Sequence, residues 1–244
     1  MIRIFLGNIG SGKTISAVRE MFFNEAKIPF YTNIQTNMNH CHMLKPYMIA
    51  TKELVKETKT GDKKYKYNVN KDFWINLKKP VSVVLDECHS MLNSRKSMSS
   101  QNTVLNDWLS LIRRVVGESS TQQGEITFIT QLVNRIDLVA REMATNIRYH
   151  ICHYYKTCLK CGTSYYETSE SPELLKSCPR CHHHELYKHS HSIEVYHFAN
   201  LSKYEGWKVW GIPNTYHMHY MIDDAEKYFP LYNTLQWDNL LEEL

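Results

Sequence analysis

The sequence lacks any apolar stretch close to the roughly 18 residues that a membrane-spanning helix needs. It also lacks a secretory signal, because the apolar run at its N-terminus is only a few residues long. The net charge of +4 is too small to indicate a nucleic-acid partner by itself, and no internal repeat is visible. These absences predict a protein of a reducing compartment. A length of 244 residues fits one substantial α/β domain with a smaller appendage.

The first 14 residues contain the strongest motif. Apolar Ile2, Ile4 and Leu6 predict a short buried strand, and residues 7–14 fit G-x-x-x-x-G-K-[ST], the phosphate-binding loop. In this motif glycines let backbone N–H groups point at the phosphates, the lysine sets a positive charge against the β- and γ-phosphates, and the hydroxyl is placed to ligate Mg²⁺. A helical pattern follows, with its N-terminus under the anion. The predicted nucleotide-binding residues are Gly7, Asn8, Ile9, Gly10, Ser11, Gly12, Lys13 and Thr14.

A second motif follows an apolar run over residues 81–85. The run ends in Asp86 and Glu87, as a buried parallel strand does when it presents carboxylates at its C-terminal edge. Together with a phosphate-binding loop this predicts a Walker B site, in which Asp86 holds Mg²⁺ and Glu87 activates the attacking water as general base. The alternative is a strand end with ordinary solvent-facing acids. The sequence has no N-K-x-D motif for guanine, but the loop reads phosphates and does not separate ATP from GTP.

Residues 124–131 predict a further buried strand with a polar tip. Gln131 at this tip is placed to sense the γ-phosphate or to position water, although a plain strand-to-loop transition would look the same. An amphipathic pattern over residues 101–116 predicts a helix, and a second helix is expected near residues 136–143. On the second helix, Arg141 fits either a surface position or an arginine that crosses an interface to stabilise transition-state charge.

Residues 52–79 contain nine lysines and four acids. Charge runs are usually solvated faces, so the first interpretation is a helix-and-hairpin rim exposed to solvent. The second interpretation is a basic surface that faces a phosphate backbone.

Four of the seven cysteines cluster in two C-x-x-C pairs. Sixteen residues separate the pairs, a spacing that matches a structural zinc ribbon whose four thiolates close a tetrahedron. A redox pair is the alternative, and one of the histidines at 182–184, 189 or 191 could replace a cysteine as ligand. Alternating patterns over residues 147–155 and 192–198 predict that the ribbon is the tip of a long β-hairpin. The predicted zinc ligands are Cys158, Cys161, Cys178 and Cys181.

The order of these motifs resembles the zonula-occludens-toxin-like ATPases and related viral genome-packaging ATPases of the FtsK–HerA group. The resemblance covers residues 1–150 and a short aromatic segment near Tyr232, and it rests on the run Ser94–Ser99 and on Thr130–Gln131 as well as on the generic motifs. It implies an additional-strand P-loop ATPase fold, in which helices flank a parallel sheet on both faces. It also implies a homo-oligomeric ring, with ATP at each interface, that moves double-stranded DNA through its channel.

By position, the resemblance assigns roles to individual residues. It implies that Lys13 and Thr14 are the Walker A residues, that Thr14 and Asp86 hold Mg²⁺, and that Glu87 is catalytic. It further implies that Gln131 is a sensor, and that Arg95 and Arg141 are candidate trans-acting fingers. The zinc hairpin is not part of the family's general pattern.

Three regions follow from this interpretation. Residues 1–150 form the P-loop ATPase core, residues 151–192 a zinc-ribbon hairpin insertion, and residues 193–244 a C-terminal strand and tail that complete the core. Within the tail, residues 207–212 favour a strand or turn.

The leading hypothesis is an ATP-driven translocase of double-stranded DNA that packages a viral genome. Filamentous-phage relatives carry a membrane span after the ATPase domain, and none is visible here. The resemblance therefore favours a soluble motor in the host cytoplasm or the virion, with capsid or portal-vertex proteins as further partners. The alternative is a virion assembly factor that remodels protein partners through the zinc hairpin. A third hypothesis is a DNA-binding zinc protein whose ATP site turns over little.

Overall fold

The computed structural model describes residues 2–24, 28–57, 63–77, 80–88, 100–116, 124–136, 138–171 and 175–233. Its strands are β1 Ile2–Leu6, β2 Phe30–Thr32, β3 Cys41–Met43, β4 Ala50–Glu57, β5 Lys63–Val69, β6 Ser82–Leu85, β7 Ile126–Ile129, β8 Asn146–Cys158, β9 Ser164–Thr168, β10 Leu186–Phe198 and β11 Met218–Ile222. Its helices are α1 Lys13–Phe22, α2 Pro46–Ile49, α3 Lys71–Ile75, α4 Ser100–Val116, α5 Leu138–Glu142 and α6 Leu201–Lys208, with 3₁₀ helices η3 Val133–Arg135 and η4 Ala225–Leu231.

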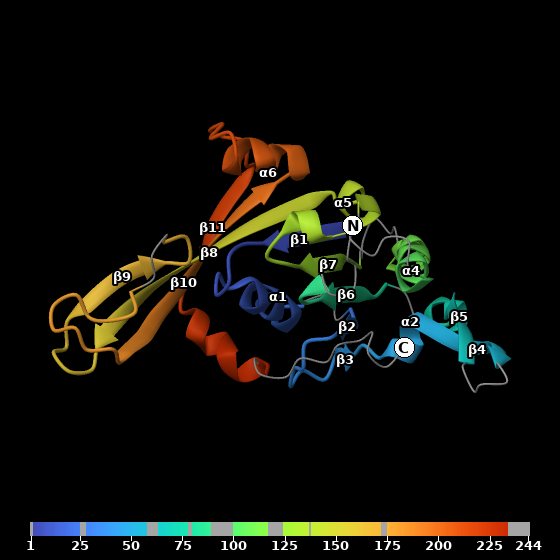
Figure 1. The fold of residues 1–244 in the computed structure, drawn as a ribbon. Helices are drawn as coiled ribbons and strands as arrows, with labels where there is room; N and C mark the ends of the chain where they lie inside the picture. The colour runs from blue at the N-terminus through green and yellow to red at the C-terminus, as the bar shows by residue number, and fades with distance from the viewer. Residues whose placement is uncertain are drawn as a thin grey trace.

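A nine-stranded sheet in the order β11-β10-β8-β1-β7-β6-β2-β3, with β9 beside β8, organises the described chain (Figure 1). The strands from β8 through β1, β7, β6 and β2 to β3 are parallel, whereas β10, β11 and β9 are antiparallel to their neighbours. Every residue of β1, β6 and β7 is buried, as expected for parallel strands covered on both faces. The fold is therefore mixed α/β with a mostly parallel central sheet, as the sequence predicts.

Helices cover both faces of the parallel part. Alternate side chains of a strand point to opposite faces, so Ile4 joins the larger core cluster with Trp108 of α4, whereas Phe5 joins a second cluster with Val18 and Met21 of α1. These side chains are at most 2% exposed. The predicted helix over residues 101–116 is thus confirmed as α4, with its apolar face on the sheet.

The two longest strands carry an extension of the sheet beyond the end of β1. One edge of β8 pairs first with β1, up to Leu6 opposite Tyr149, and later with β9, from His153 opposite Thr168. The other edge of β8 pairs with β10 over nearly the whole strand. We call residues 153–190, which comprise β9, the distal halves of β8 and β10 and the two cysteine turns, the arm (Figure 1). Strand β8 crosses the predicted boundary at 150 without interruption, whereas the pairing of β10 with β8 shifts register between His189 and Ser192, next to the boundary at 192. The three-region division stays a prediction about folding units.

One prediction for the C-terminal region is confirmed only in part. Residues 209–210 form a turn within the predicted strand or turn over residues 207–212, but Trp207 and Lys208 are the last two residues of helix α6. The side chain of Asn200 caps this helix by accepting a hydrogen bond from the backbone N–H of Lys203. Tyr204 and Trp207, three positions apart, both lie against Tyr149 of β8, with ring centroids 5.5 and 5.6 Å away. Packing of this aromatic pair on the sheet overrides the local strand preference.

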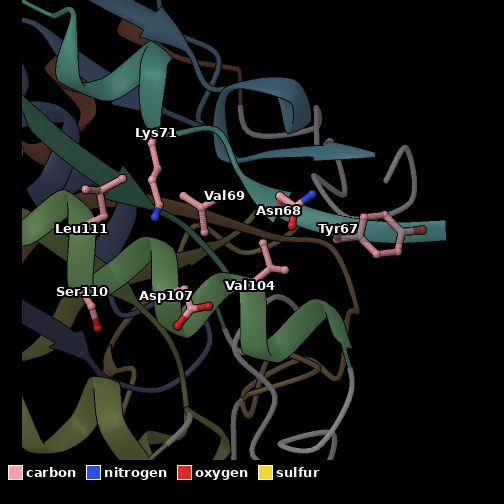
Figure 2. Close-up of a pocket in the computed structure, with 8 residues that line it drawn as sticks. All are labelled: Tyr67, Asn68, Val69, Lys71, Val104, Asp107, Ser110 and Leu111. Carbon is pink, nitrogen blue, oxygen red and sulfur yellow. The ribbon is translucent and has the colours of Figure 1, made fainter. Parts of the chain in front are cut away.

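At the other end of the sheet, the lysine-rich segment forms the β4–β5 hairpin followed by α3, which agrees with the predicted helix and hairpin. A cavity of about 470 Å³ lies between β5 and α4, with Lys71 and Asp107 on opposite walls (Figure 2). Within the described residues, no helix combines the length and the apolar content that crossing a membrane would require.

Candidate functional site

Three neighbouring parallel strands end at the same edge of the sheet, and each is followed by residues that the sequence singles out. The loop 7–12 follows β1, Gln131 follows β7 and the pair Asp86–Glu87 follows β6. Since β7 lies between β1 and β6, these segments converge at the carboxyl edge where open α/β sheets bind ligands. They surround a cavity of about 190 Å³, lined by residues 9–15, Glu87, Gln131 and Tyr232.

The loop backbone requires glycine at two positions. Gly7 and Gly12 have φ of 148° and 86°, conformations that other residues rarely adopt. A Cβ on Gly7 would lie 2.5 Å from the carbonyl oxygen of His150, and one on Gly12 would lie 2.4 Å from Cδ1 of Ile193. The loop therefore rests directly on β8 and β10, with its backbone free to face a phosphate on the other side.

Lys13 lies inside this loop. Its Nζ donates hydrogen bonds to the carbonyl oxygens of Gly7 (2.9 Å) and Asn8 (2.8 Å), and the residue is only 7% exposed. Burial lowers the pKa of Lys13, and the negative charges of Asp86 and Glu87 partly offset that effect. The ammonium and the N-terminus of α1, which begins at Lys13, thus place positive charge at one point, as a phosphate chain requires.

Thr14, which lines the cavity, is in direct contact with Asp86. The hydroxyl of Thr14 donates to Oδ2 of Asp86 at 2.7 Å, although the two residues are 72 positions apart. Burial raises the pKa of Asp86, whereas hydrogen bonds from Thr14 and from the backbone N–H of Glu87 act in the opposite direction. An adjacent hydroxyl and carboxylate oxygen form a donor set that fits Mg²⁺.

The predicted base and the predicted sensor are in contact. Gln131 Nε2 donates to Oε1 of Glu87 at 3.3 Å. The backbone N–H of Glu87 donates to Oδ1 of Asp86 at 2.8 Å, and Glu87 has φ of 48°, in the left-handed region. Such a backbone conformation in a residue other than glycine costs energy and is found preferentially at functional sites. The turn orients the Glu87 carboxylate toward Gln131 and the phosphate loop.

Of the two candidate arginine fingers, the structure describes only Arg141. Arg95 lies outside the described residues. Arg141 lies on α5, just before Thr145, whose backbone N–H donates to the carbonyl oxygen of Ile2 at the start of β1. The phosphate loop follows the other end of this five-residue strand, about 16 Å away at the usual rise of a strand. Arg141 is therefore at the edge of the sheet opposite its own phosphate loop.

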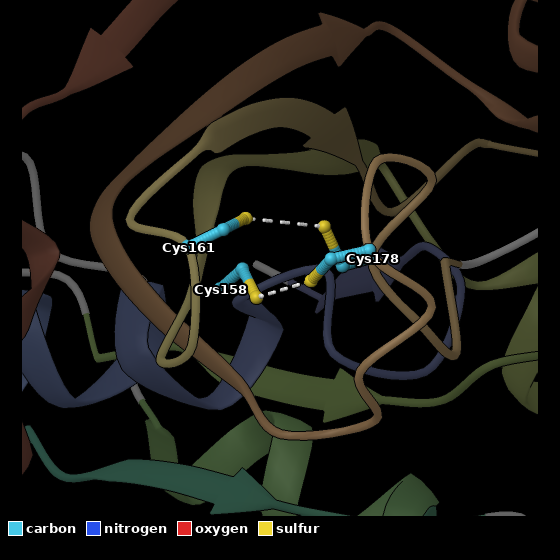
Figure 3. Close-up of side chains that lie close together, drawn as sticks. Cys158, Cys161 and Cys178 are labelled. Carbon is cyan, nitrogen blue, oxygen red and sulfur yellow. Dashed lines mark hydrogen bonds between the residues drawn. The ribbon is translucent and has the colours of Figure 1, made fainter.

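The four clustered cysteines come together at the end of the arm. Their sulfur atoms all lie within 4.8 Å of one another, and Cys158 Sγ is 3.6 Å from Cys181 Sγ, as is Cys161 Sγ from Cys178 Sγ. Figure 3 shows three of these thiols converging on one point. All four are free thiols, and 3.6 Å is far longer than a disulfide bond of about 2.05 Å.

The two cysteine turns have the same backbone hydrogen bonds. In the first turn, the N–H of Gly162 donates to the carbonyl oxygen of Cys158 at 2.9 Å. The N–H of Cys158 donates in turn to the carbonyl oxygen of Thr163 at 3.0 Å. In the second turn, the N–H of His182 donates to the carbonyl oxygen of Cys178, and the N–H of Cys178 donates to the carbonyl oxygen of His183, both at 2.8 Å. Gly162 and His182 both have positive φ, of 68° and 58°. The two turns thus present their cysteines to the same central point in equivalent ways.

Comparisons with known proteins identify the family. A family model described as zonular occludens toxin (Zot) matches residues 1–193. The chain belongs to this family. No curated protein matches it significantly.

Comparison with solved structures finds matches to a Zot protein and to a viral protein. The crystal structure of the N-terminal domain of zonular occludens toxin from Neisseria meningitidis is 16% identical, with 95% of this chain and 98% of that chain covered and a TM-score of 0.49. The genome packaging NTPase B204 from Sulfolobus turreted icosahedral virus 2, in complex with ATP-gammaS, is 12% identical. That comparison covers 61% of this chain and 74% of that chain, with a TM-score of 0.36.

Sequence reasoning missed three side chains around the phosphate loop of this Zot-family chain. Asn33, just after β2, fixes the backbone of Asp86 from both sides: its Nδ2 donates to the Asp86 carbonyl (2.9 Å), and its Oδ1 accepts from the Asp86 N–H (2.8 Å). Tyr232 lines the cavity, and burial together with the charge of Asp86 raises its pKa to about 12. Lys188 of β10 approaches Gly10. Asn33 has a sequence signal, namely a polar residue directly after a strand, and Tyr232 lies in the aromatic segment that the family resemblance includes.

Proposed function

We propose that the chain binds a nucleoside triphosphate with Mg²⁺ at the phosphate loop and hydrolyses it, with ATP as the working substrate. The observation that carries this proposal is the convergence of five side chains at one edge of the sheet. Lys13 lies in the loop, Thr14 contacts Asp86, and Gln131 contacts Glu87. An ordinary glycine-rich surface turn does not explain why a buried ammonium, a buried carboxylate and a second carboxylate with a polar partner lie together here.

Each residue of the site has a separate role in hydrolysis. The backbone N–H groups of residues 10–14 and the Lys13 ammonium bind the β- and γ-phosphates, which holds the γ-phosphorus in place. Mg²⁺, held by Thr14 and Asp86, supplies charge neutralisation of the phosphate oxygens when it is bound. Glu87 accepts a proton from the attacking water, and Gln131 orients that carboxylate or the water through its amide.

We further propose that hydrolysis moves double-stranded DNA through a homo-oligomeric ring, as in viral genome packaging. Two observations support this finer function. Arg141 lies too far from its own phosphate loop to serve it, so a role at a nucleotide requires another copy of the chain. Lys52, Lys66 and Lys71 are exposed on the β4–β5 hairpin and α3, as a sequence-independent contact with phosphate backbone requires.

A zinc ion at the end of the arm belongs to the same proposal. A tetrahedron with Zn–S bonds of about 2.3 Å has S–S edges of about 3.8 Å. The two short edges of 3.6 Å and the equivalent backbone of the two turns fit this geometry. Four thiolate ligands leave no open position, so the zinc is structural and holds together a tip too small to have its own core.

The second candidate function is an assembly factor that remodels protein partners through the arm. The exposed aromatic side chains Tyr166 (56% exposed) and Tyr187 (61%) on the arm favour it, since exposed tyrosines are common in protein interfaces. In this case double-stranded DNA does not change the rate of hydrolysis.

The deciding experiment measures ATP hydrolysis with and without double-stranded DNA at two salt concentrations. The wild-type chain is compared with Glu87→Gln and with Glu53→Gln, a control on the exposed hairpin. We expect DNA to raise the rate at low salt, and Glu87→Gln to lower kcat by about 10²–10⁴-fold while Glu53→Gln does not. Hydrolysis that ignores DNA would favour the remodelling factor. Full activity of Glu87→Gln would contradict the assignment of the base.

A further inference from the structure

A second cavity adjoins the phosphate loop. It measures about 440 Å³, and its walls come from the loop and the start of α1, from β8 and β10, and from the C-terminal segment around η4. Three of its lining residues, Gly10, Ile15 and Tyr232, also line the smaller cavity around Lys13. The two cavities are therefore neighbours that share a wall, and the second one has no part in the phosphate chemistry described above.

The residues that line each cavity indicate the direction in which a nucleotide would lie. Glu87 and Gln131, which act at the γ-phosphate, line only the smaller cavity. Ile15, one residue beyond the Mg²⁺ ligand Thr14, lines both. A triphosphate with its γ end at Glu87 extends toward the shared residues, so the group attached to its α-phosphate enters the second cavity. That group is the nucleoside.

The chemistry of the second cavity suits a flat heteroaromatic ring. Phe229 is 37% exposed, and its ring centroid lies 5.5 Å from that of His191, with the rings nearly perpendicular. His191 is held in place because its Nδ1 lies 2.8 Å from Oε1 of Glu226, which also accepts from the His191 backbone N–H. Rings fixed in this way offer π faces to a base at little entropic cost, and stacking accepts any of the bases.

A positive charge lies where the two cavities meet. Lys188 Nζ is 4.0 Å from the position that a Cβ on Gly10 would take, and it lies over the ring of Tyr154, 3.6 Å from the centroid. Burial lowers the pKa of Lys188. A phosphate nearby would favour its charged form, which makes the junction a suitable place for the phosphate next to the ribose.

We propose that the second cavity is the nucleoside subsite, in which the base stacks on Phe229 beside Tyr232 and Lys188 meets the phosphate next to the ribose. This inference rests on the proposed nucleotide binding at the phosphate loop. It makes β10 and the η4 segment part of the nucleotide site.

The test compares two probes by calorimetric titration in Mg²⁺: ATP, and inorganic tripolyphosphate, which has the phosphate chain without the nucleoside. Phe229→Leu keeps apolar bulk but removes the π face, and Phe229→Tyr keeps the ring. We expect Phe229→Leu to weaken ATP binding by about tenfold, in line with base–aromatic stacking, and to leave tripolyphosphate binding unchanged. Phe229→Tyr should bind ATP like the wild type. Tyr47→Ala, which removes an exposed ring from α2, is the matched control and should change neither affinity.

Unchanged tripolyphosphate binding by Phe229→Leu also shows that this variant is folded. Equal ATP affinity in the wild type and Phe229→Leu, together with loss of both probes in Lys13→Ala, would overturn the subsite and leave the proposed function standing. If the wild type binds neither probe, the proposed function and the subsite fail together. A loss of ATP affinity in Phe229→Tyr equal to that in Phe229→Leu would also overturn the stacking role.

Discussion

The phosphate-loop site and the cysteine cluster are built in opposite ways. The phosphate-loop site draws on residues from Gly7 to Tyr232 and exists only because β1, β7, β6 and β2 lie side by side. The four thiols lie within one short segment, and two local turns of the same form aim them at one point. Damage to the sheet should therefore destroy the first site, whereas damage to a ligand should destroy the second and leave the first largely intact. Four predictions test this contrast.

The largest effect is expected from Cys178→Ser. Cys178 is fully buried, and its replacement removes one of four proposed ligands of a metal whose binding is coupled to folding of the tip. We expect loss of the one zinc per chain, seen by elemental analysis, and destabilisation of the arm by several kcal/mol, seen by hydrogen exchange. Cys41→Ser, at a cysteine outside the cluster, is the control. An ATP affinity as low as that of Lys13→Ala would contradict the separation of the two sites.

Asn33→Ala should have the next largest effect, and this effect falls on the phosphate-loop site. It leaves the N–H and the carbonyl oxygen of Asp86 without their side-chain partner, which costs about 1–3 kcal/mol of folding stability. Because Asp86 is displaced, we also expect a lower kcat with little change in zinc content. Asn37→Ala is the matched control, since Asn37 donates from an exposed position to the carbonyl oxygen of Pro230. Urea denaturation and phosphate release measure the two effects, and equal behaviour of the two variants would refute the positioning role.

The third prediction concerns the pH dependence of folding stability that His150 causes. This residue of β8 lies next to the phosphate loop. Burial lowers the pKa of His150 to about 3, and its Nδ1–H donates to the carbonyl oxygen of Leu6. Between about pH 6.5 and 3 the unfolded chain binds a proton here that the folded chain does not, so stability rises with pH in this window and is lost on acidification. One such proton corresponds to about 1.4 kcal/mol per pH unit.

Replacement of His150 by Gln should make unfolding less dependent on pH, and chemical denaturation at pH 7, 6 and 5 measures this slope. His184→Gln, at an exposed histidine near the cysteine cluster, should leave the slope as it is. The assignment to His150 would be wrong if both variants kept the wild-type slope.

The smallest effect is expected from His182→Gly. His182 has φ of 58°, where its counterpart in the other cysteine turn is Gly162. Glycine removes the strain of a left-handed side chain but adds freedom to the unfolded chain, so the net gain in stability is at most about 1 kcal/mol. Thermal denaturation of the zinc-loaded chain measures it. Gly162→His, the reverse change, should destabilise the arm, and stabilisation instead would show that the two turns are not equivalent.

The sequence could predict the parts of each site that lie within one short segment. The phosphate loop and the helix after it, the acids after β6 and the spacing of the cysteines all follow from residues a few positions apart. The parallel core was also predictable, because uninterrupted apolar runs favour strands covered on both faces. The short strand β9 was not predicted, since Ser164–Thr168 forms a strand only by pairing with β8.

By itself, therefore, the sequence determined which chemical groups are present: a phosphate loop, a pair of carboxylates and two cysteine pairs. Only the tertiary structure decided that Asn33 holds Asp86, that Gln131 contacts Glu87, and that β8 and β10 carry the arm past the phosphate loop. The physical reason is that local motifs depend on backbone conformations that a few neighbouring residues specify. Contacts between strands depend instead on register and on burial of the whole sheet, which no single segment specifies.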